Sequence, residues 1–442
     1  MIDNSIIVAP ATALGGAIAV IRISGEGSVA CCDQIFKGRK PLIEAKTHTL
    51  HYGTICDDER VVDDVVVAVF RAPHSYTGEE SVEISIHGSR YIAQEVIRLL
   101  CAKGARLAEA GEFSQRALAS GRIDLSQAEA VADLIASESR ASHAMAATQM
   151  RGGYSDMLDG LREELLNITT LLELELDFSE EDVEFADRAR LRTMLEHTDN
   201  IVARLMESFR IGNAIREGVA VVIVGCPNVG KSTLLNRLVG DDRAMVSDIA
   251  GTTRDTVEES VVIDDIKFRF VDTAGLHDTD DKLEQMGIER TEQAMRKAQI
   301  VLYVVEPEQC GLELPELADN QQLLVVVNKI DTSDRRDIED AIYISARDGD
   351  GIDELRKILR ATVDTDGLYR GDVVVSNMRH FEALSRAHTS LQGAISALDI
   401  GVSEELLAED IRGAITSLAE ITGRITSDDI LKNVFSRFCI GK

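Results

Sequence analysis

The 442-residue sequence contains no Cys-x-x-Cys pair, no long apolar run and no basic leader segment. Its seven cysteines are scattered, so a thiolate metal site is not expected, and their odd number without a leader predicts a reduced, cytoplasmic protein. Because no run of about 18 apolar residues occurs, no membrane span is predicted. The terminal Cys-Ile-Gly-Lys places a cysteine where a prenylation box has one, but Gly441 and Lys442 do not fit that box.

Positive charge is also scarce, because 47 lysines and arginines stand against 76 acidic residues and leave a net charge of −29. A protein that coats nucleic acid by neutralising phosphates needs a basic surface. Any RNA contact is therefore expected to be local or supplied by a partner. Since 45% of the residues are apolar, the chain can bury sizeable cores, and its length predicts roughly two to four domains.

The first stretch, residues 1–118, is predicted to form mostly strands, because it contains the apolar runs Ala17–Ile21 and Val65–Phe70 and alternating polarity in Ser81–His87. Val82, Ile84 and Ile86 alternate with polar residues, so one face of this segment is expected to be buried. Glu83 then lies on the polar face of the same strand.

Helical spacing replaces this alternation in residues 119–215 and returns in residues 366–442. Asp124 precedes the first predicted helix as a candidate cap. One face of that helix is expected to carry Leu125, Ala128, Val131 and Ile135. Further helices are predicted over Met157–Leu176 and Arg188–Ile211.

Strands and helices alternate in residues 216–365, which predicts a parallel sheet covered on both faces. The expected strands are Val219–Val224, Ile266–Val271, Ile300–Val305, Leu323–Val327 and Ala341–Ile344. In Ile266–Val271 apolar residues alternate with charged ones, which predicts an exposed strand at an edge. Because helical stretches flank this α/β unit, we interpret it as an insertion into one helical domain.

The strand Val219–Val224 leads into Gly225-Cys-Pro-Asn-Val-Gly-Lys-Ser232 and a helical segment, the context that the P-loop pattern GxxxxGKS requires. Backbone amides and the helix N-terminus of such a loop hold phosphate groups. Lys231 is expected to reach the outer phosphates, and the Ser232 hydroxyl to bind Mg²⁺. The predicted nucleotide contacts of this segment are Asn228, Val229, Gly230, Lys231, Ser232 and Thr233.

Further motifs follow strand ends in the order that a GTPase needs. In Asp272-Thr-Ala-Gly275, the Asp is predicted to support magnesium and the Gly275 amide to meet the terminal phosphate. Asn328-Lys329-Ile-Asp331 predicts selection of GTP, because a carboxylate accepts hydrogen bonds from two donors that guanine has and adenine lacks. Ser345-Ala346-Arg347 is expected to support the guanine O6 through a backbone amide.

The groups that turn over GTP do not follow from these motifs. Small Ras-like GTPases orient water with a glutamine directly after the Asp-Thr-Ala-Gly motif, and here Leu276 holds that position. Arg254 lies in the switch-like Gly-Thr-Thr-Arg-Asp segment 251–255, where a role in the switch itself is favoured over a catalytic one. Another polar group and another positive charge are therefore expected.

Several motifs outside the nucleotide site extend along the whole sequence: Ala19-Val-Ile-Arg-Ile-Ser-Gly25, Ser75-Tyr-Thr-Gly-Glu79, Gly111-Glu-Phe113, Asp124-Leu-Ser-Gln-Ala-Glu-Ala130 and Phe438-Cys-Ile-Gly-Lys442. With them the chain resembles the family of tRNA-modification GTPases MnmE, also called TrmE. The resemblance implies an α+β folate-binding N-terminal domain, residues 1–118, and an all-α helical domain, residues 119–215 and 366–442. A Ras-like α/β P-loop G domain, residues 216–365, interrupts the helical domain.

The same resemblance implies the missing groups at the nucleotide site. Potassium takes the place of an arginine, and its matched ligands are Asn228, Ser247, Ile249, through its backbone oxygen, and Thr252. Thr253 matches the magnesium-binding threonine, and Glu284 matches a glutamate that orients water. Without the resemblance, Asn228 is an ordinary turn residue and Glu284 a surface charge. Two G domains are expected to meet across their nucleotides.

A folate site is implied in the N-terminal domain, with 5,10-methylenetetrahydrofolate or 5-formyltetrahydrofolate as ligand. The matched positions are Arg22, Glu83, Arg122 and Lys442, although the family usually has lysine at the position of Arg122. Gly-Arg-Gly-Gly of the family is replaced by Thr12-Ala-Leu-Gly-Gly16. Cys439 is compatible with direct chemistry, with placement of the chain end in the folate site, and with ordinary packing.

The implied function is modification of C5 of the wobble uridine in certain tRNAs, with an aminomethyl or carboxymethylaminomethyl group as product. The chain is expected to form a homodimer through its N-terminal domain and a heterotetramer with an MnmG-type partner that carries FAD. Two other interpretations remain: a regulatory GTPase switch in ribosome assembly without folate chemistry, and a folate-dependent aminomethyltransferase with an added regulator.

Overall fold

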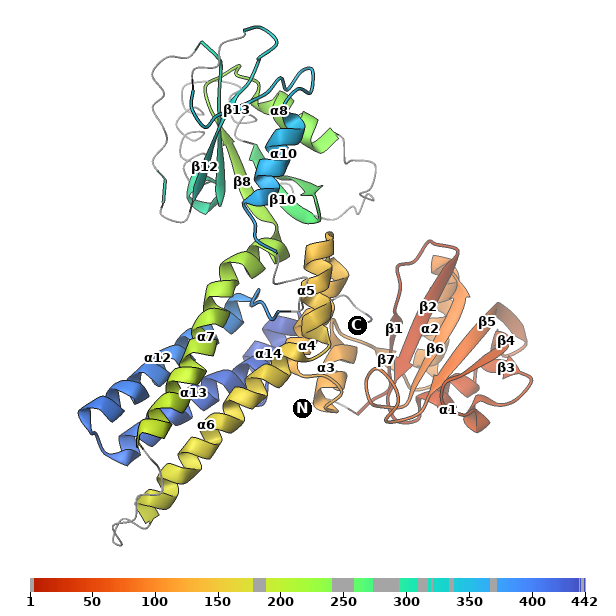
Figure 1. Ribbon diagram of the computed structural model, residues 1–442. Coiled ribbons are helices and arrows are strands. Elements are labelled where there is room, and N and C mark those ends of the chain that lie inside the picture. The colour runs from red at the N-terminus through yellow and green to blue at the C-terminus, as the bar shows by residue number, and fades with distance from the viewer. Residues whose placement is uncertain are drawn as a thin grey trace, which may run out of the picture. The chain divides into compact units, whose positions relative to one another are not determined.

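The computed structural model describes residues 4–177, 188–240, 258–272, 294–308, 317–318, 321–333, 338–365, 372–436, 438 and 441. The chain divides into two compact units. Figure 1 labels their helices and strands. Unit 1 contains residues 1–132, 154–162 and 418–442, and unit 2 contains residues 133–153 and 163–417. Within the described ranges, no helix is long and apolar enough to cross a membrane.

Unit 1 is built on a seven-stranded sheet with the order β3-β4-β5-β6-β2-β1-β7. Its strands are β1 (Ile7–Pro10), β2 (Ile18–Ser24), β3 (Phe36–Gly38), β4 (Thr49–Asp57), β5 (Arg60–Phe70), β6 (Ser81–His87) and β7 (Arg106–Leu107). The predicted alternation in β6 is confirmed, because Val82, Ile84 and Ile86 are buried and Glu83 faces the other side. The buried face packs against helices α1 (Ser28–Asp33) and α2 (Arg90–Ala102).

Helix α4 (Leu125–Ala136) begins where the sequence predicts, because Asp124 and Gln127 form a reciprocal cap. The Asp124 carboxylate accepts from the Gln127 amide at 2.9 Å, and the Gln127 side chain accepts from the Asp124 amide at 2.9 Å. The predicted apolar face is wrong at its far end, since Ile135 is 51% exposed. The near end of the predicted face is confirmed, because Leu125 and Ala128 are buried, and α4 also buries Glu129.

The described residues near the C-terminus belong to unit 1, and Gly441 lies beside the first strand. Helix α14 (Asp428–Phe435) packs against α3 (Glu112–Ala119), and Phe435 and Phe438 join Leu125 and Ala128 in one apolar cluster. Gly441 has a φ of +103°, and a Cβ there would lie 2.0 Å from the Pro10 carbonyl oxygen. A residue with a side chain does not fit at this position, so the glycine allows the backbone to approach β1 here.

Unit 2 contains a six-stranded sheet with the order β13-β12-β11-β8-β10-β9. Its strands are β8 (Val219–Val224), β9 (Glu258–Ile263), β10 (Ile266–Asp272), β11 (Ile300–Val305), β12 (Gln322–Val327) and β13 (Ile342–Tyr343). Neighbouring strands run parallel except for the antiparallel pair β9–β10. The prediction of an edge position for Ile266–Val271 is wrong, because β9, which alternation in β10 cannot reveal, covers that side.

Both faces of this sheet are covered, as the apolar strands predict. Val221 and Ile223 pack on helices α8 (Lys231–Gly240) and α10 (Ile352–Ala361), whereas Val222 and Val224 belong to a second cluster on the opposite face. Because consecutive residues of β8 are buried on alternate faces, β8 lies in the middle layer of a three-layer α/β arrangement.

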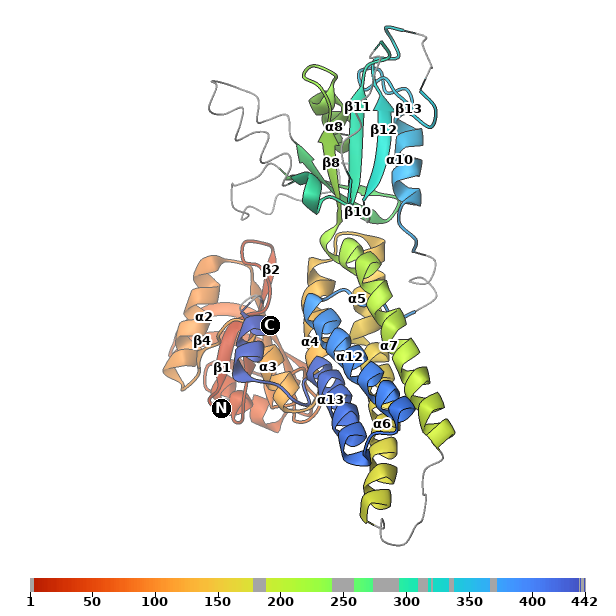
Figure 2. The same ribbon diagram turned by 90° about the vertical axis from the view of Figure 1, so that its left-hand side faces the viewer.

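The helices of unit 2 include α5 (Arg140–Met150), part of α6 (Gly153–Asp177), α7 (Arg188–Glu217), α12 (Met378–Ile400) and most of α13 (Glu404–Thr422). Figure 2 shows α7 beside α12. These two helices are joined through Asp199, whose carboxylate accepts from His388 at 2.6 Å and also contacts Gln392. Helix α7 is longer than predicted and ends one residue before the glycine that precedes β8.

The β9–β10 hairpin contacts α5 within unit 2. The Ala141 amide donates to the Asp265 carbonyl oxygen at 3.2 Å, and Lys267 pairs with Glu138 at 2.9 Å. The α/β sheet is therefore attached to the helices by more than its two chain connections.

Candidate nucleotide site and N-terminal polar site

The P-loop follows β8 and continues into α8, as the sequence predicts. Gly225 has a φ of +148°, and a Cβ there would lie 2.2 Å from the Val304 carbonyl oxygen. Gly230 has a φ of +98°, and its Cβ would lie 2.3 Å from the Asn328 side-chain nitrogen. Asn228 also adopts a positive φ, of +65°. Glycine is thus required at both ends of the loop, which leaves its backbone open to a phosphate chain.

Lys231 lies at the first position of α8 and is only 6% exposed. Its Nζ donates to the carbonyl oxygens of Gly225 and Cys226 at 2.8 and 3.0 Å. These bonds place the ammonium group inside the loop, where it would face the phosphates of a bound nucleotide. Ser232 and Thr233, the next residues of the helix, are exposed. The described residues therefore fit a nucleoside triphosphate with Mg²⁺: a backbone cradle, a buried cation and an accessible hydroxyl.

Asn328 connects three parts of the nucleotide site. Its side chain is buried, with the residue 3% exposed, at the end of β12. Its Nδ2 donates to the Val229 carbonyl oxygen at 2.8 Å, and its Oδ1 accepts from the Ala346 amide at 2.9 Å. One amide side chain thus joins the predicted phosphate loop to the two predicted base-recognition segments.

Asp331 and Ser345, predicted at the guanine end, contact each other. The Ser345 hydroxyl donates to Asp331 Oδ1 at 3.0 Å, while Asp331 itself is exposed. Lys329 has a φ of +65°, and its Nζ pairs with Glu306 at 2.5 Å. Ser345 thus orients a carboxylate that remains accessible from outside.

Arg237 was missed by the sequence reasoning. It lies in the last turns of α8, and its Nε donates to the Ala346 carbonyl oxygen at 3.2 Å. It also donates to the Arg347 carbonyl oxygen. The only sequence signal is a basic residue near the end of the helix that follows the P-loop, which is common for capping reasons alone.

Part of the predicted site lies outside the described residues. Asp272 ends β10 opposite Ile223 of β8, and its backbone is described while its side chain is not. The predicted residues outside the described ranges are Ser247, Ile249, Thr252, Thr253, Gly275, Glu284, Cys439 and Lys442, together with Arg254 and Leu276.

The N-terminal polar site contains two of the predicted folate residues in contact. Arg22 of β2 and Glu83 of β6 are opposite each other in the sheet register. Arg22 Nε and Nη2 both donate to Glu83 Oε1, at 2.9 and 2.8 Å. The guanidinium carbon lies 5.2 Å from the centre of the Tyr76 ring and 5.7 Å from that of Phe113. The sheet thus brings together a cation and a carboxylate that are 61 residues apart in sequence.

Arg122 and the chain end lie in the same unit as this pair. Arg122 is exposed, and its Cγ lies 3.1 Å from the position of a Cβ at Gly78, in the loop that carries Tyr76. Gly441 contacts Pro10, the neighbour of the β1 residue Ala9 that pairs with Arg22. The described residues therefore supply charge of both signs and an aromatic wall, which suits a planar ligand with an acidic tail.

The α/β part of unit 2 is a Ras-like G domain, because its three-layer arrangement carries a P-loop with a buried lysine and the Asn328 bridge. The whole chain is a multidomain protein with α-helical and α+β parts. Two family models match the chain: the MnmE helical domain over residues 125–439 and the GTP-binding protein TrmE N-terminus over residues 6–122. The chain belongs to the family of tRNA modification GTPases MnmE.

Full-length relatives support this assignment. The tRNA modification GTPase MnmE of Bacteroides thetaiotaomicron is 46% identical over 464 aligned residues, covering 100% of both chains. That of Cytophaga hutchinsonii is 47% identical and covers 97% of this chain and 95% of the relative. Among solved structures, Aquifex aeolicus Era bound to GDP·AlF4⁻ is 27% identical, covers 38% of this chain and 65% of that one, and has a TM-score of 0.26.

Proposed function

We propose that this protein is a potassium-dependent GTPase that acts with a flavin-containing partner to modify C5 of the tRNA wobble uridine, using a folate-borne one-carbon unit. The observation that carries the GTPase part is the Asn328 side chain, which binds the P-loop and the Ser345–Arg347 segment at once. Membership of the MnmE family supports the tRNA part.

Selection of guanine rests on Asp331, whose carboxylate Ser345 orients at 3.0 Å. A carboxylate can accept hydrogen bonds from the two N–H donors of guanine, whereas adenine lacks this donor pair. We expect purified protein to hydrolyse GTP at least about a hundredfold faster than ATP at equal concentration. Comparable rates for the two nucleotides would remove the GTPase assignment.

For hydrolysis we propose that Lys231 neutralises phosphate charge, that Asn228 contributes to a potassium site, and that Glu284 orients water. Potassium would supply the positive charge that an arginine supplies in other GTPases. Replacing potassium by sodium should then lower turnover sharply, and Glu284→Ala should lower turnover while GTP affinity stays nearly unchanged. Equal turnover in both salts would exclude the potassium role, whatever the effect of the glutamate.

For the folate step we propose that Arg22, Glu83, Arg122 and the end of the chain around Lys442 hold a tetrahydrofolate. The Arg22–Glu83 pair supports this, because both groups are partly exposed beside Tyr76 rather than sealed in the core. Titration with 5-formyltetrahydrofolate tests it. Absence of binding would favour a regulatory GTPase switch, such as one in ribosome assembly, over folate chemistry.

We also propose a cytoplasmic homodimer formed through the N-terminal sheet, which then binds an MnmG-type FAD protein and tRNA. The face of β4 and β5 opposite to the core exposes apolar residues, with Leu50 72% and Tyr52 71% exposed. Tyr52 pairs with Val66, also exposed, so these side chains form one patch. Leu50→Glu with Tyr52→Glu should give monomers in light scattering without nucleotide; an unchanged mass would exclude this face.

The substrate is tested most directly in cells. Deletion of the gene should remove the aminomethyl or carboxymethylaminomethyl group from wobble uridines in a nucleoside analysis of bulk tRNA. Normal wobble uridines would refute the substrate while leaving the GTPase assignment intact.

A further inference from the structure

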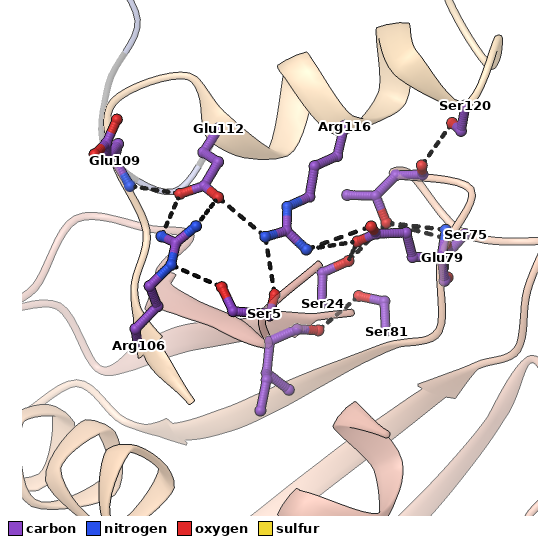
Figure 3. Close-up of polar contacts among 12 residues, drawn as sticks. Ser5, Ser24, Ser75, Glu79, Ser81, Arg106, Glu109, Glu112, Arg116 and Ser120 are labelled. Atoms are coloured by element: carbon purple, nitrogen blue, oxygen red, sulfur yellow. Dashed lines mark hydrogen bonds and ion pairs between the residues drawn. The ribbon is translucent and has the colours of Figure 1, made fainter. Parts of the chain in front are cut away.

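A buried ionic network lies behind the N-terminal polar site, centred on Arg116 of α3. The Arg116 side chain is 1% exposed. Its Nη1 donates to the Glu79 carboxylate at 3.1 Å, and its Nη2 donates to Glu112 Oε1 at 3.0 Å and to the Ser5 carbonyl oxygen at 2.9 Å. Figure 3 shows Arg116 between the two carboxylates. The cation therefore joins two acidic residues that belong to different segments.

The Glu112 side of the network leads away from the polar site. Glu112 is paired with Arg106 at 2.6 Å and accepts from the Glu109 amide at 2.9 Å. Burial raises the pKa of the Glu112 carboxyl, but hydrogen bonds from Arg106, Glu109 and Arg116 outweigh burial and hold the pKa below its ordinary value. These contacts fasten the start of α3 to β7.

The Glu79 side leads into the loop that carries Tyr76. Glu79 Oε2 accepts from the Ser24 hydroxyl at 3.0 Å, and that hydroxyl lies 2.7 Å from the Thr77 hydroxyl. The Ser75 hydroxyl donates to the Glu79 carbonyl oxygen at 2.6 Å. Ser75 and Thr77 are both buried, so the residues on either side of Tyr76 are fixed inside the domain.

Tyr76 contacts both helix α3 and the polar site. Its hydroxyl lies 2.8 Å from the Ser114 hydroxyl, and its ring faces the Arg22 guanidinium. Helix α3 thus supplies Arg116 behind the loop, Ser114 at the Tyr76 hydroxyl and Phe113 beside Arg22. The position of the Tyr76 ring depends on contacts on both of its sides.

Stability alone is a weak reason for such a network, because buried ion pairs rarely stabilise more than apolar packing of the same volume. A cation with fixed hydrogen-bond directions does, however, select one conformation of the groups around it. At this place the conformation selected is that of the loop 75–79 beside Arg22 and Glu83.

We propose that Arg116 is a positioning residue which, through Glu79, holds Tyr76 as the aromatic wall of the ligand site, and that Tyr76 takes the planar ring of a pterin-type ligand. The inference rests on the folate site proposed above. A flat heteroaromatic ring packs against a tyrosine face, while Glu83 accepts from ring or amino N–H groups. The Glu79 end of the network thus positions Tyr76, whereas the Glu112 end fastens the start of α3 to β7.

Glu79→Gln and Glu112→Gln form a matched pair, because each removes one carboxylate partner of Arg116. Both proteins should lose thermal stability. Glu79→Gln should also weaken binding of 5-formyltetrahydrofolate about tenfold, comparable to the loss of an aromatic contact, whereas Glu112→Gln should change it less than about twofold. Tyr76→Phe, which keeps the ring but removes the contact with Ser114, should lose less affinity than Tyr76→Ala, which removes the ring. GTP hydrolysis should stay unchanged in all four variants.

Hydrogen exchange gives a readout without ligand. Backbone amides of residues 75–80 should exchange at least about tenfold faster in Glu79→Gln than in wild type, and not in Glu112→Gln. Equal exchange or equal affinity loss in the two glutamate variants would overturn the positioning role. Wild-type protein that binds no folate would instead refute the ligand class and the proposed folate site, while the exchange data would still decide whether Arg116 holds the loop.

Discussion

Asn328→Asp is the sharpest test of the nucleotide site, because it keeps the shape of the side chain and removes one donor. Asn328 Nδ2 donates to the Val229 carbonyl oxygen at 2.8 Å in a buried environment. The substitution brings a carboxylate oxygen against a carbonyl oxygen, while the bond from the Ala346 amide can persist. Leaving a buried acceptor unpaired costs about 1–3 kcal/mol, and an unpaired buried charge adds to that.

We therefore expect a loss of about 3 kcal/mol in the free energy of unfolding of the G domain. For a domain of this size that corresponds to a fall in Tm of roughly 10 °C. Differential scanning calorimetry of the full chain measures it, and titration with a fluorescent GDP analogue should show an affinity reduced at least about tenfold, because the phosphate loop and the base segments lose their common link.

Asn377→Asp is the matched control for this prediction. Asn377 caps α12, where its side chain only accepts, from the Arg379 amide at 3.0 Å. A carboxylate accepts equally well at a helix N-terminus, so the same chemical change should alter stability by less than about 0.5 kcal/mol. If the two variants melt together, or if Asn328→Asp binds GDP like wild type, the bridging role of Asn328 is refuted.

Three further outcomes are expected. Gly212→Ala in α7 should destabilise the protein by about 2 kcal/mol, because the new Cβ would lie 2.2 Å from a carbonyl oxygen of the segment before α12. Gly160→Ala in α6 is the control and should not destabilise, because a Cβ there has no heavy atom within 4 Å. Equal melting temperatures of the two variants would contradict this prediction. Because the pKa of Glu112 is lowered in the folded protein, its contribution is present above the ordinary value of 4.5 and is lost as pH falls through the lower folded pKa. Acid unfolding of Glu112→Gln, followed by circular dichroism, should be less steep in that range, and an unchanged slope would count against the pairing. Iodoacetamide should label the exposed Cys226 and spare Cys32, because burial raises the pKa of the Cys32 thiol. Bound GDP should protect Cys226 from labelling. Mass spectrometry measures both, and labelling of Cys32 before Cys226 would contradict the burial of Cys32.

The sequence by itself determined the features that depend on neighbours along the chain. The strand β8, the P-loop and the start of α8 form one continuous segment whose glycines and periodicity specify a phosphate cradle. The alternation in β6 predicted its buried face, and Asp124 predicted the start of α4. In each case the physical cause lies within a few residues, so the pattern is visible without the fold.

Only the tertiary structure decided which distant groups meet. Periodicity places Glu83 on a polar face, but the sheet register makes Arg22 its partner, and no pattern predicts that Arg116 would join Glu79 to Glu112. Alternation in β10 suggested an exposed strand, yet β9 lies beside it. A local pattern predicts which side chains of an element are buried. It does not predict which residues cover them, because the covering residues come from segments far away in the sequence.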